Sequence, residues 1–173
     1  MHLKRASDDP PPGLEQMLRE LGGGESGFGG TSFGPGRKDL PGFLRECIDG
    51  EDPAKVNPGF VPMTVFWVTD DADQLVGIVR LRHHLNEQLL QRGGHVGYYI
   101  RPGARGMGHA KAALRLALDR LREMGVERGL VTVDPDNAAS IRVILANGGV
   151  PDAPGRHPES GLPVNRYWID LSR

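Results

Sequence analysis

Apolar residues recur at helical spacing in two short segments near the start of the chain. In the first segment they are Leu14, Met17, Leu18 and Leu21. In the second they are Leu40, Phe43, Leu44, Cys47 and Ile48. Residues three and four apart lie on one face of a helix. The pattern therefore predicts a short helix over 13–21 and a second one that stops near Gly50, each packing an apolar stripe against a sheet.

Strand patterns follow from residue 63 onward. Segment 63–70 is rich in β-branched and aromatic residues, a polar turn comes next, and 75–82 forms the second arm of a predicted hairpin. Residues 83–92 make a polar excursion with room for one helical turn, and two glycines end it. We predict another strand over 95–100.

A helix over residues 108–124 is the best-defined predicted element, with one apolar face and Gly125 as its stop. A short buried strand over 129–133 follows it. Strand, helix and strand within about 40 residues make a βαβ unit, which is normally right-handed and parallel.

Two more elements close the pattern. A helix capped by Asp136 or Asn137 runs to about Asn147, and residues 164–171 form a last strand that could pair across a homodimer. The predicted fold class is α/β (α+β). We expect a mixed, mostly antiparallel sheet with one parallel strand pair at its centre and helices on its faces.

The chain length of 173 residues suggests one domain overall. Within it, residues 1–37 form an N-terminal segment with a short helix, and residues 38–173 form the main domain. Residues 22–36 combine many glycines with no hydrophobic periodicity, so we expect a flexible Gly-rich loop there.

Net charge, cysteine count and the length of apolar runs argue against several classes of protein. The net charge is -1, which gives no global basic field for nucleic acid or a membrane surface. Cys47 is the single cysteine, so the chain holds no internal disulfide framework and no CxxC metal pair. No apolar run approaches the roughly 18 residues of a membrane span, and the first residues lack a signal-peptide core. A cytoplasmic protein is the default expectation.

The chemistry-bearing segment is the turn between the strand at 95–100 and the helix at 108–124. Its sequence is Arg105-Gly106-Met107-Gly108-His109-Ala110, followed by Lys111. A helix N-terminus holds N–H groups without partners at the positive end of the helix dipole, and glycine lets a ligand approach the backbone. The turn therefore predicts a site for a phosphate or diphosphate.

The spacing Arg105-x-x-Gly108-x-Ala110 fits the R/Q-x-x-G-x-G/A signature of the GNAT superfamily of acetyl-CoA-dependent N-acetyltransferases. Residues 97–102 before the turn, Asn137-x-x-Ser140, and an Asn-Gly-Gly run at 147–149 resemble the same family. The resemblance covers roughly residues 60–171 and is nearest to a branch of predicted acetyltransferases of unknown substrate.

The resemblance implies acetyl-CoA as co-substrate and a set of residues that bind it. These are Tyr99, Ile100, Arg105, Gly106, Met107, Gly108, His109, Ala110, Lys111, Asn137 and Ser140. A turn with glycine for geometry alone is the plainer alternative. A dinucleotide fold is a rival, although the third glycine of its motif is replaced by Lys111, and no Walker phosphate loop is present.

The resemblance further implies that strands 95–100 and 129–133 splay apart and hold the pantetheine arm between them. Gly97 could begin the splay, or could simply allow close packing. An N–H near residues 98–100 would polarise the thioester carbonyl. Asn137 would contact the pantetheine, serve as a helix cap, or do both.

One family position departs from the pattern. Many members carry a tyrosine seven residues after the asparagine, as the acid that protonates the leaving thiolate, and this chain has Ile144 there. Tyr98, Tyr99 and Tyr167 are candidates for that role by residue type, and a thiolate can also leave unassisted.

Nearby histidines and a glutamate are candidates for the base that deprotonates an amine. They are His83, His84, Glu87 and His95, and a solvated polar loop is the alternative for each. A metal site at His83 and Glu87 lacks a third ligand, so we expect no metal.

Together these features predict transfer of acetyl from acetyl-CoA to a primary amine of a small molecule or peptide, by direct attack in a ternary complex. The acceptor stays open among antibiotics, polyamines, amino acids and protein N-termini. A non-catalytic acyl-CoA-binding sensor or partner module is the alternative, and a nicotinamide or flavin protein is a weaker one. No nucleic acid or membrane partner is expected.

Overall fold

The computed structural model describes residues 1–172. Its strands are β1 (His2–Arg5), β2 (Gly24–Glu25), β3 (Phe28–Gly29), β4 (Met63–Thr69), β5 (Leu75–Arg82), β6 (Val96–Ile100), β7 (Arg128–Val133), β8 (Val150–Arg156) and β9 (Pro163–Asp170). Its helices are α1 (Leu14–Leu21), α2 (Leu40–Asp49), α3 (Glu87–Gln91), the 3₁₀ turn η1 (Pro102–Ala104), α4 (His109–Glu123) and α5 (Ala138–Leu145).

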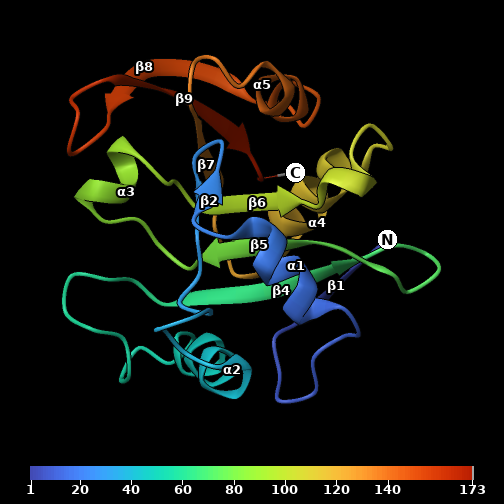
Figure 1. Ribbon diagram of the computed structural model, residues 1–173. Helices are drawn as coiled ribbons and strands as arrows, with labels where there is room; N and C mark the ends of the chain where they lie inside the picture. Colours follow the sequence, from blue (N-terminus) through green and yellow to red (C-terminus); the bar gives the residue numbers. More distant parts are fainter. Residues whose placement is uncertain (173) are drawn as a thin grey trace.

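The strands form two main sheets and a small hairpin (Figure 1). One sheet has four antiparallel strands in the order β1-β4-β5-β6. The other has three antiparallel strands in the order β7-β9-β8, and β2 pairs with β3 in the hairpin. The expected mixed α/β class with mostly antiparallel strands is confirmed.

The predicted central parallel pair is not a hydrogen-bonded ladder, because β6 and β7 belong to different sheets. They are joined at one place. The His95 backbone N–H donates to the Leu130 carbonyl at 2.8 Å, and the Leu130 N–H donates to His95 Nδ1 at 2.9 Å. Beyond this junction the two strands have no ladder between them.

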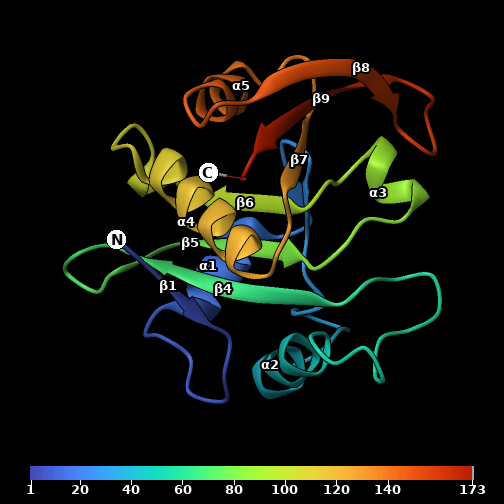
Figure 2. The ribbon, with the colours of Figure 1, turned by 180° about the vertical axis from the view of Figure 1, so that it is seen from behind.

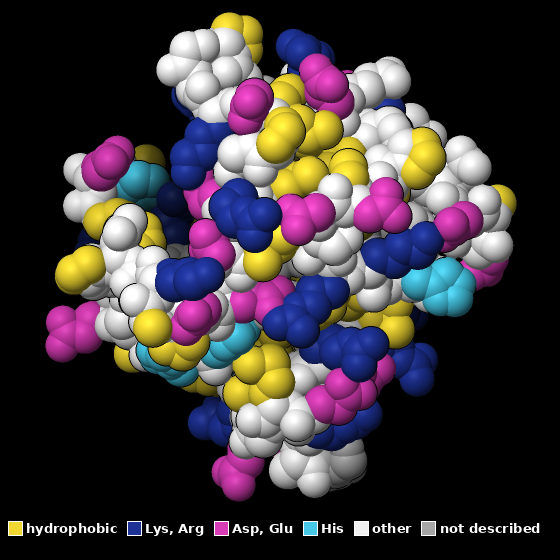
Figure 3. Space-filling view, turned by 90° about the horizontal axis from the view of Figure 1, so that it is seen from below, with side chains coloured by type: hydrophobic (Ala, Val, Ile, Leu, Met, Phe, Trp, Pro, Cys, Tyr) yellow, Lys and Arg dark blue, Asp and Glu magenta, His cyan; other side chains and the backbone are white. Residues whose placement is uncertain are grey.

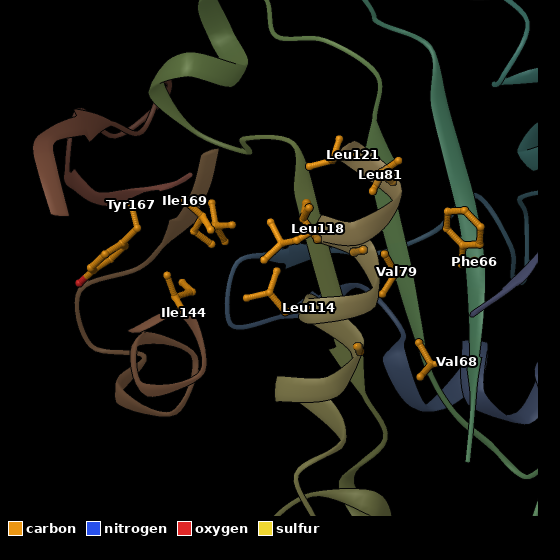
Figure 4. Packing of buried hydrophobic residues seen from close by; sticks show 14 of the residues in the cluster. Phe66, Val68, Val79, Leu81, Leu114, Leu118, Leu121, Ile144, Tyr167 and Ile169 are labelled. Atoms are coloured by element: carbon orange, nitrogen blue, oxygen red, sulfur yellow. The ribbon is translucent and has the colours of Figure 1, made fainter. Parts of the chain in front are cut away.

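Helix α4 fills the angle between the two sheets. Its Leu114, Leu118 and Leu121 side chains lie between the first sheet and the second (Figure 4). They meet Val79 and Leu81 of β5 on one side and Ile144, Tyr167 and Ile169 on the other. This buried apolar cluster fixes the direction of α4, and with it the position of the turn at the start of the helix.

A second core covers the opposite face of the four-stranded sheet. Helices α1 and α2 lie on that face, while α4 lies on the other (Figure 2). Leu14 and Met17 of α1 and Phe43 of α2 are buried here, together with Trp67 of β4. Cys47 joins this core, and burial raises the pKa of its thiol to about 12, so it stays protonated at neutral pH.

Side-chain caps set the starts of three helices. The carboxylate of Asp39 accepts from the Gly42 N–H at 2.9 Å at the start of α2. Asn86 accepts from the Leu89 N–H at 2.9 Å before α3. Asn137 accepts from the Ser140 N–H at 3.1 Å before α5. The predicted N-cap role of Asn137 is therefore confirmed.

The Gly-rich stretch at 22–36 differs from the expected loop. Residues 24–29 form the β2–β3 hairpin, and the Phe28 side chain is buried. Glycine serves close backbone approach here, because a β-carbon on Gly24 would lie 2.3 Å from the Phe28 carbonyl oxygen. Residues 24–29 are therefore a hairpin and not a loop, because the glycines that indicate flexibility in the sequence also allow close backbone packing.

Two strands have no clear signal in the sequence. Strand β1 is polar and largely exposed along an edge, and β8 carries two prolines and a register shift.

Strand β9 lies between β7 and β8, so its backbone has no free edge. The suggestion that residues 164–171 pair across a homodimer is therefore wrong.

The surface carries no single-sign field on the face that is seen from below. Lys and Arg side chains alternate there with Asp and Glu (Figure 3). Among residues 1–172, no helix combines the length and the apolarity needed to cross a membrane.

The His95 junction gives a testable dependence of stability on pH. Burial, reinforced by Arg82, lowers the pKa of His95 from 6.5 to about 4. Between pH 6.5 and about pH 4, His95 is therefore protonated in the unfolded chain but neutral in the native protein. The stabilisation by neutral His95 is present above pH 6.5 and is lost as the pH falls toward 4, by roughly 3 kcal/mol at most.

The measurement is urea unfolding of the parent and of His95→Asn between pH 4 and pH 8. Asparagine keeps an acceptor for the Leu130 N–H and does not titrate. The difference in unfolding free energy between the two proteins should shrink or reverse as the pH falls. A pH-independent difference would contradict the assignment of His95 as a neutral junction.

Candidate active site

The Gly-rich turn before α4 has the form of an anion site. Gly106 and Gly108 have φ values of 77° and 83°, and Gly108 is the residue that caps α4. No atom lies within 4 Å of a β-carbon built on either glycine, so the turn faces open space. The N–H groups from Gly106 to Ala110 have no acceptor among the described residues.

Charged and apolar side chains frame this turn. The Arg105 Nε donates to the Ile100 carbonyl at 2.9 Å, which ties the turn to the end of β6. The Arg105 guanidinium also pairs with Glu25 and lies 5.7 Å from the centre of the Tyr99 ring. Lys111 and Met107 are exposed, the latter by 68%.

A cavity of about 910 Å³ opens where β6 and β7 diverge. Its walls come from β6, the end of β7, the first turns of α5, the β2–β3 hairpin, helix α2 and the loop at 55–61. The Gly-rich turn lies outside these walls. The cavity is large enough for a small acceptor and the reactive end of a long donor.

The β2–β3 hairpin touches both sides of the diverging strands. A β-carbon on Gly97 of β6 would lie 3.6 Å from the Phe28 ring. The Asn137 Nδ2 donates to the Ser26 carbonyl at 3.4 Å, and Glu25 pairs with Arg105. The hairpin thus pairs with Arg105 of the Gly-rich turn, lines the cavity, and reaches the start of α5.

The Tyr98 side chain lines the cavity together with Ser140 and Ile144. Its hydroxyl is buried and has no hydrogen-bond partner at ordinary geometry. Burial raises the pKa of Tyr98, and the neighbouring Ser140 hydroxyl offsets part of that shift. Tyr98 therefore keeps its proton at neutral pH and can donate it.

A carboxylate that sequence reasoning missed also lines the cavity. Asp134 follows the last residue of β7, lies 4.0 Å from the Arg92 guanidinium, and is half-buried. A β-carbon on Gly27 would lie 3.1 Å from Asp134 Oδ2, so the hairpin crosses close to it. Its place directly after a buried strand was the signal available in the sequence.

Two arginines were missed as well. Arg80 and Arg82 alternate with Leu81 on β5 and both line the cavity. Arg80 donates to the Gly29 carbonyl at 3.0 Å and to the Gly30 carbonyl at 2.7 Å, and it lies 4.3 Å from the Phe28 ring centre. Charged residues at alternate positions of an otherwise apolar strand were the signal.

Comparison with family models decides the family. Residues 45–150 match the model described as the acetyltransferase (GNAT) domain, which is more than half of the chain. The chain belongs to the GNAT acetyltransferase family. No curated protein sequence matches it.

Solved structures share the GNAT fold with this chain at low sequence identity. A spermidine N-acetyltransferase chimera from Vibrio cholerae and hSSAT has a TM-score of 0.65 and 18% identity, over 99% of this chain and 95% of that one. The yncA protein of Salmonella typhimurium, assigned as an acetyltransferase and solved with its cofactor acetyl-CoA, has a TM-score of 0.62 and 15% identity, over 98% and 93%.

A third similar structure is the ribosomal-protein-S5-alanine acetyltransferase from Vibrio fischeri. Its TM-score is 0.52 at 18% identity, and the match covers 63% of this chain and 62% of that one. At such identities the likeness concerns the fold alone.

The candidate bases named from the sequence lie away from this GNAT cavity. His95 is buried at the junction with β7, and His83 Nε2 lies 2.9 Å from the Thr64 hydroxyl. His84 and Glu87 are exposed, and none of these side chains lines the cavity. The structure brings together Tyr98, Asn137 and Ser140 instead. No group of three metal-ligating side chains occurs among residues 1–172.

The hydrogen bonds of Arg80 predict how firmly the hairpin is held. Arg80→Met keeps the apolar contact with Phe28 but removes both bonds to the hairpin carbonyls. We expect faster amide exchange across residues 24–30 and a loss of about 1–3 kcal/mol in unfolding free energy.

Hydrogen exchange read by mass spectrometry tests this expectation. Arg120→Met serves as the matched control, because within residues 1–172 the Arg120 side chain forms only a surface ion pair with Glu123 on α4. Unchanged exchange at 24–30 in Arg80→Met would show that the hairpin is held by other contacts.

Proposed function

We propose that this GNAT chain transfers the acetyl group of acetyl-CoA to a primary amine by direct attack in a ternary complex. One observation carries the proposal: the β2–β3 hairpin joins a cavity at the divergence of β6 and β7 to an open turn, whose N–H groups have no acceptor among the described residues. The turn can hold a diphosphate and the cavity a thioester with its acceptor. A cytoplasmic location stays a prediction of the sequence.

The residues around the turn fit the diphosphate of acetyl-CoA. Gly106 and Gly108 leave room for phosphate oxygens at the N–H groups of the turn, and Arg105 and Lys111 supply positive charge. The pantetheine arm would run from there along β6 toward the cavity, past Asn137 and Ser140. These residues belong to both the sequence prediction and the proposed path.

Backbone groups of β6 are suited to the thioester carbonyl. The Arg101 N–H donates toward β5, to the Val76 carbonyl at 2.9 Å. Since alternate residues of an antiparallel strand direct their N–H groups to the same edge, Tyr98 and Ile100 have theirs on the edge toward β7. An N–H on that edge can stabilise the oxyanion that forms during attack.

In the proposed reaction, Asp134 accepts a proton from the acceptor ammonium group, directly or through one water. The free amine nitrogen attacks the thioester carbonyl carbon and forms the new C–N bond. The nitrogen of the tetrahedral intermediate loses its second proton to water, the C–S bond breaks, and the thiolate takes a proton from the Tyr98 hydroxyl. Solvent then returns a proton to the Tyr98 oxygen. Tyr98 thus fills the role for which other family members use the position of Ile144.

The donor site can be tested with two glycine variants of α4. Gly108→Ala adds a methyl group at the anion turn, whereas Gly125→Ala adds one at the other end of the helix. Both positions have positive φ, of 83° and 82°, and open space around them, so the backbone strain is matched. We expect acetyl-CoA to bind Gly108→Ala at least tenfold more weakly than Gly125→Ala.

Thermal shift and calorimetric titration with acetyl-CoA provide the measurement. The unmodified protein should gain stability with acetyl-CoA and lose none of that gain to NAD or FAD as competitors. No binding of acetyl-CoA at millimolar concentration would end the proposal.

Tyr98→Phe tests the chemistry. We expect a 10- to 100-fold fall in kcat for CoA release with a reactive amine, and little change in acetyl-CoA affinity. Tyr167→Phe is the matched control, because the Tyr167 side chain is buried away from the cavity. Acetyl-CoA binding without CoA release for any amine would favour the sensor module instead.

A further inference from the structure

The cavity wall carries more cationic than anionic side chains. The cations are Lys38, Arg45, Lys55, Arg80, Arg82 and Arg92, and the carboxylates are Glu46, Asp49 and Asp134. Most of the cations are paired: Lys38 with Glu46, Lys55 with Asp49, Arg45 with Asp8, and Arg92 with Asp134. Arg80 and Arg82 have no carboxylate at ion-pair distance among residues 1–172.

The Arg82 guanidinium uses only some of its N–H donors in hydrogen bonds to the described residues. Its NH1 group donates to the Gly93 carbonyl at 3.0 Å and to the Gly94 carbonyl at 3.2 Å. The Nε and NH2 groups have no acceptor among the described residues. An arginine carries five N–H donors, so most of the guanidinium of Arg82 is left without a protein partner. The NH1 bonds fix its direction.

The environment of Arg82 makes a lone positive charge unfavourable. Burial, together with repulsion from Arg80, lowers the pKa of Arg82 to about 10. Burial also lowers the pKa of Arg80. Two half-buried guanidinium groups on one strand, neither with a carboxylate at ion-pair distance among the described residues, would be stabilised by an anion in the cavity.

We propose that Arg82, supported by Arg80, binds an anionic group of the acceptor, which is a small primary amine that also carries a carboxylate or a phosphate. This inference rests on the proposed function and names its substrate class. Arg80 holds the hairpin and adds positive charge, while Arg82 presents its free fork to the anion.

The location of these side chains suits such a molecule. Arg80 stands opposite Gly97 in the register of β5 and β6, and Arg82 lies two residues further, about 7 Å along the strand. That end of β6 is the closed end, where His95 joins β7. Asp134 lies at the other end of the divergence, after β7.

The two ends of the cavity therefore offer different partners: Asp134, which lies 4.0 Å from Arg92, at one end, and the Nε and NH2 groups of Arg82 at the other. Asp134 attracts the ammonium group that must be deprotonated, and Arg82 attracts the anion at the opposite end of the acceptor. A polyamine such as spermidine would bring a second cation toward Arg82, which is repulsive. The structure thus favours a different acceptor from the one named for the spermidine N-acetyltransferase chimera.

The experiment uses amines that are matched except for the anion. The first set is 4-aminobutyrate against 4-aminobutanamide, and the second is phosphoethanolamine against ethanolamine, with spermidine as the cationic comparison. Binding to the full chain in the presence of CoA is measured by calorimetry, and acetylation by CoA release. We expect the anionic member to bind at least tenfold more tightly in at least one set, which also tells a carboxylate from a phosphate.

Two substitutions separate recognition from folding. Arg82→Gln should abolish the preference for the anionic member and leave binding of the neutral amine unchanged. Arg82→Lys keeps the positive charge but lacks the planar guanidinium, so it should retain part of the preference for the anionic member. This variant keeps the inference testable if Arg82→Gln folds poorly. A structural role alone would weaken both members of a set equally.

The outcomes for the two proposals are distinct. Equal binding of anionic and neutral amines, tighter binding of spermidine, or no binding of any anionic member overturns the anion inference. Acetyl-CoA binding, measured separately on the same protein, is untouched by those results and fails only with the proposed function.

Discussion

The contact between His95 and Leu130 is the constraint on which the site depends. It holds β6 to β7 at one end through a backbone bond and a ring nitrogen, and it leaves the two strands free to diverge. Gly94 makes this approach possible, because a β-carbon there would lie 2.4 Å from the Leu130 carbonyl oxygen. A neutral buried imidazole thus takes the place of a ladder, and the cavity opens just beyond it.

Packing of α4 fixes the Gly-rich turn at its N-terminus relative to the cavity between β6 and β7. The apolar stripe of the helix is buried against both sheets, so the helix N-terminus cannot move independently of β6 and β7. Arg105 ties the preceding turn to the last carbonyl of β6. The Gly-rich turn and the cavity are consequently held at a fixed separation, as the proposed binding of a long donor with a charged end and a reactive end requires.

The sequence was informative where a signal is local. The periodicity of 108–124 and the glycines before it identified α4 and the turn that precedes it, and Asn137 was correctly predicted as a cap. The sequence was uninformative where partners come from distant segments. Asp134 and Arg82 become candidate site residues only because the folded chain places them in the cavity wall. His95 is a residue type that often acts as a base, but its contacts here are those of a structural residue.

The ion pair between Glu25 and Arg105 lowers the free energy that an anionic ligand can gain by binding at the turn. The guanidinium is already neutralised by a carboxylate from the hairpin, so an incoming oxyanion exchanges one counter-ion for another. The net gain is the difference between two ion pairs, not the full strength of one. Tight retention then depends more on Lys111 and on the main-chain donors, and the number of those donors does not change with pH or with ionic strength.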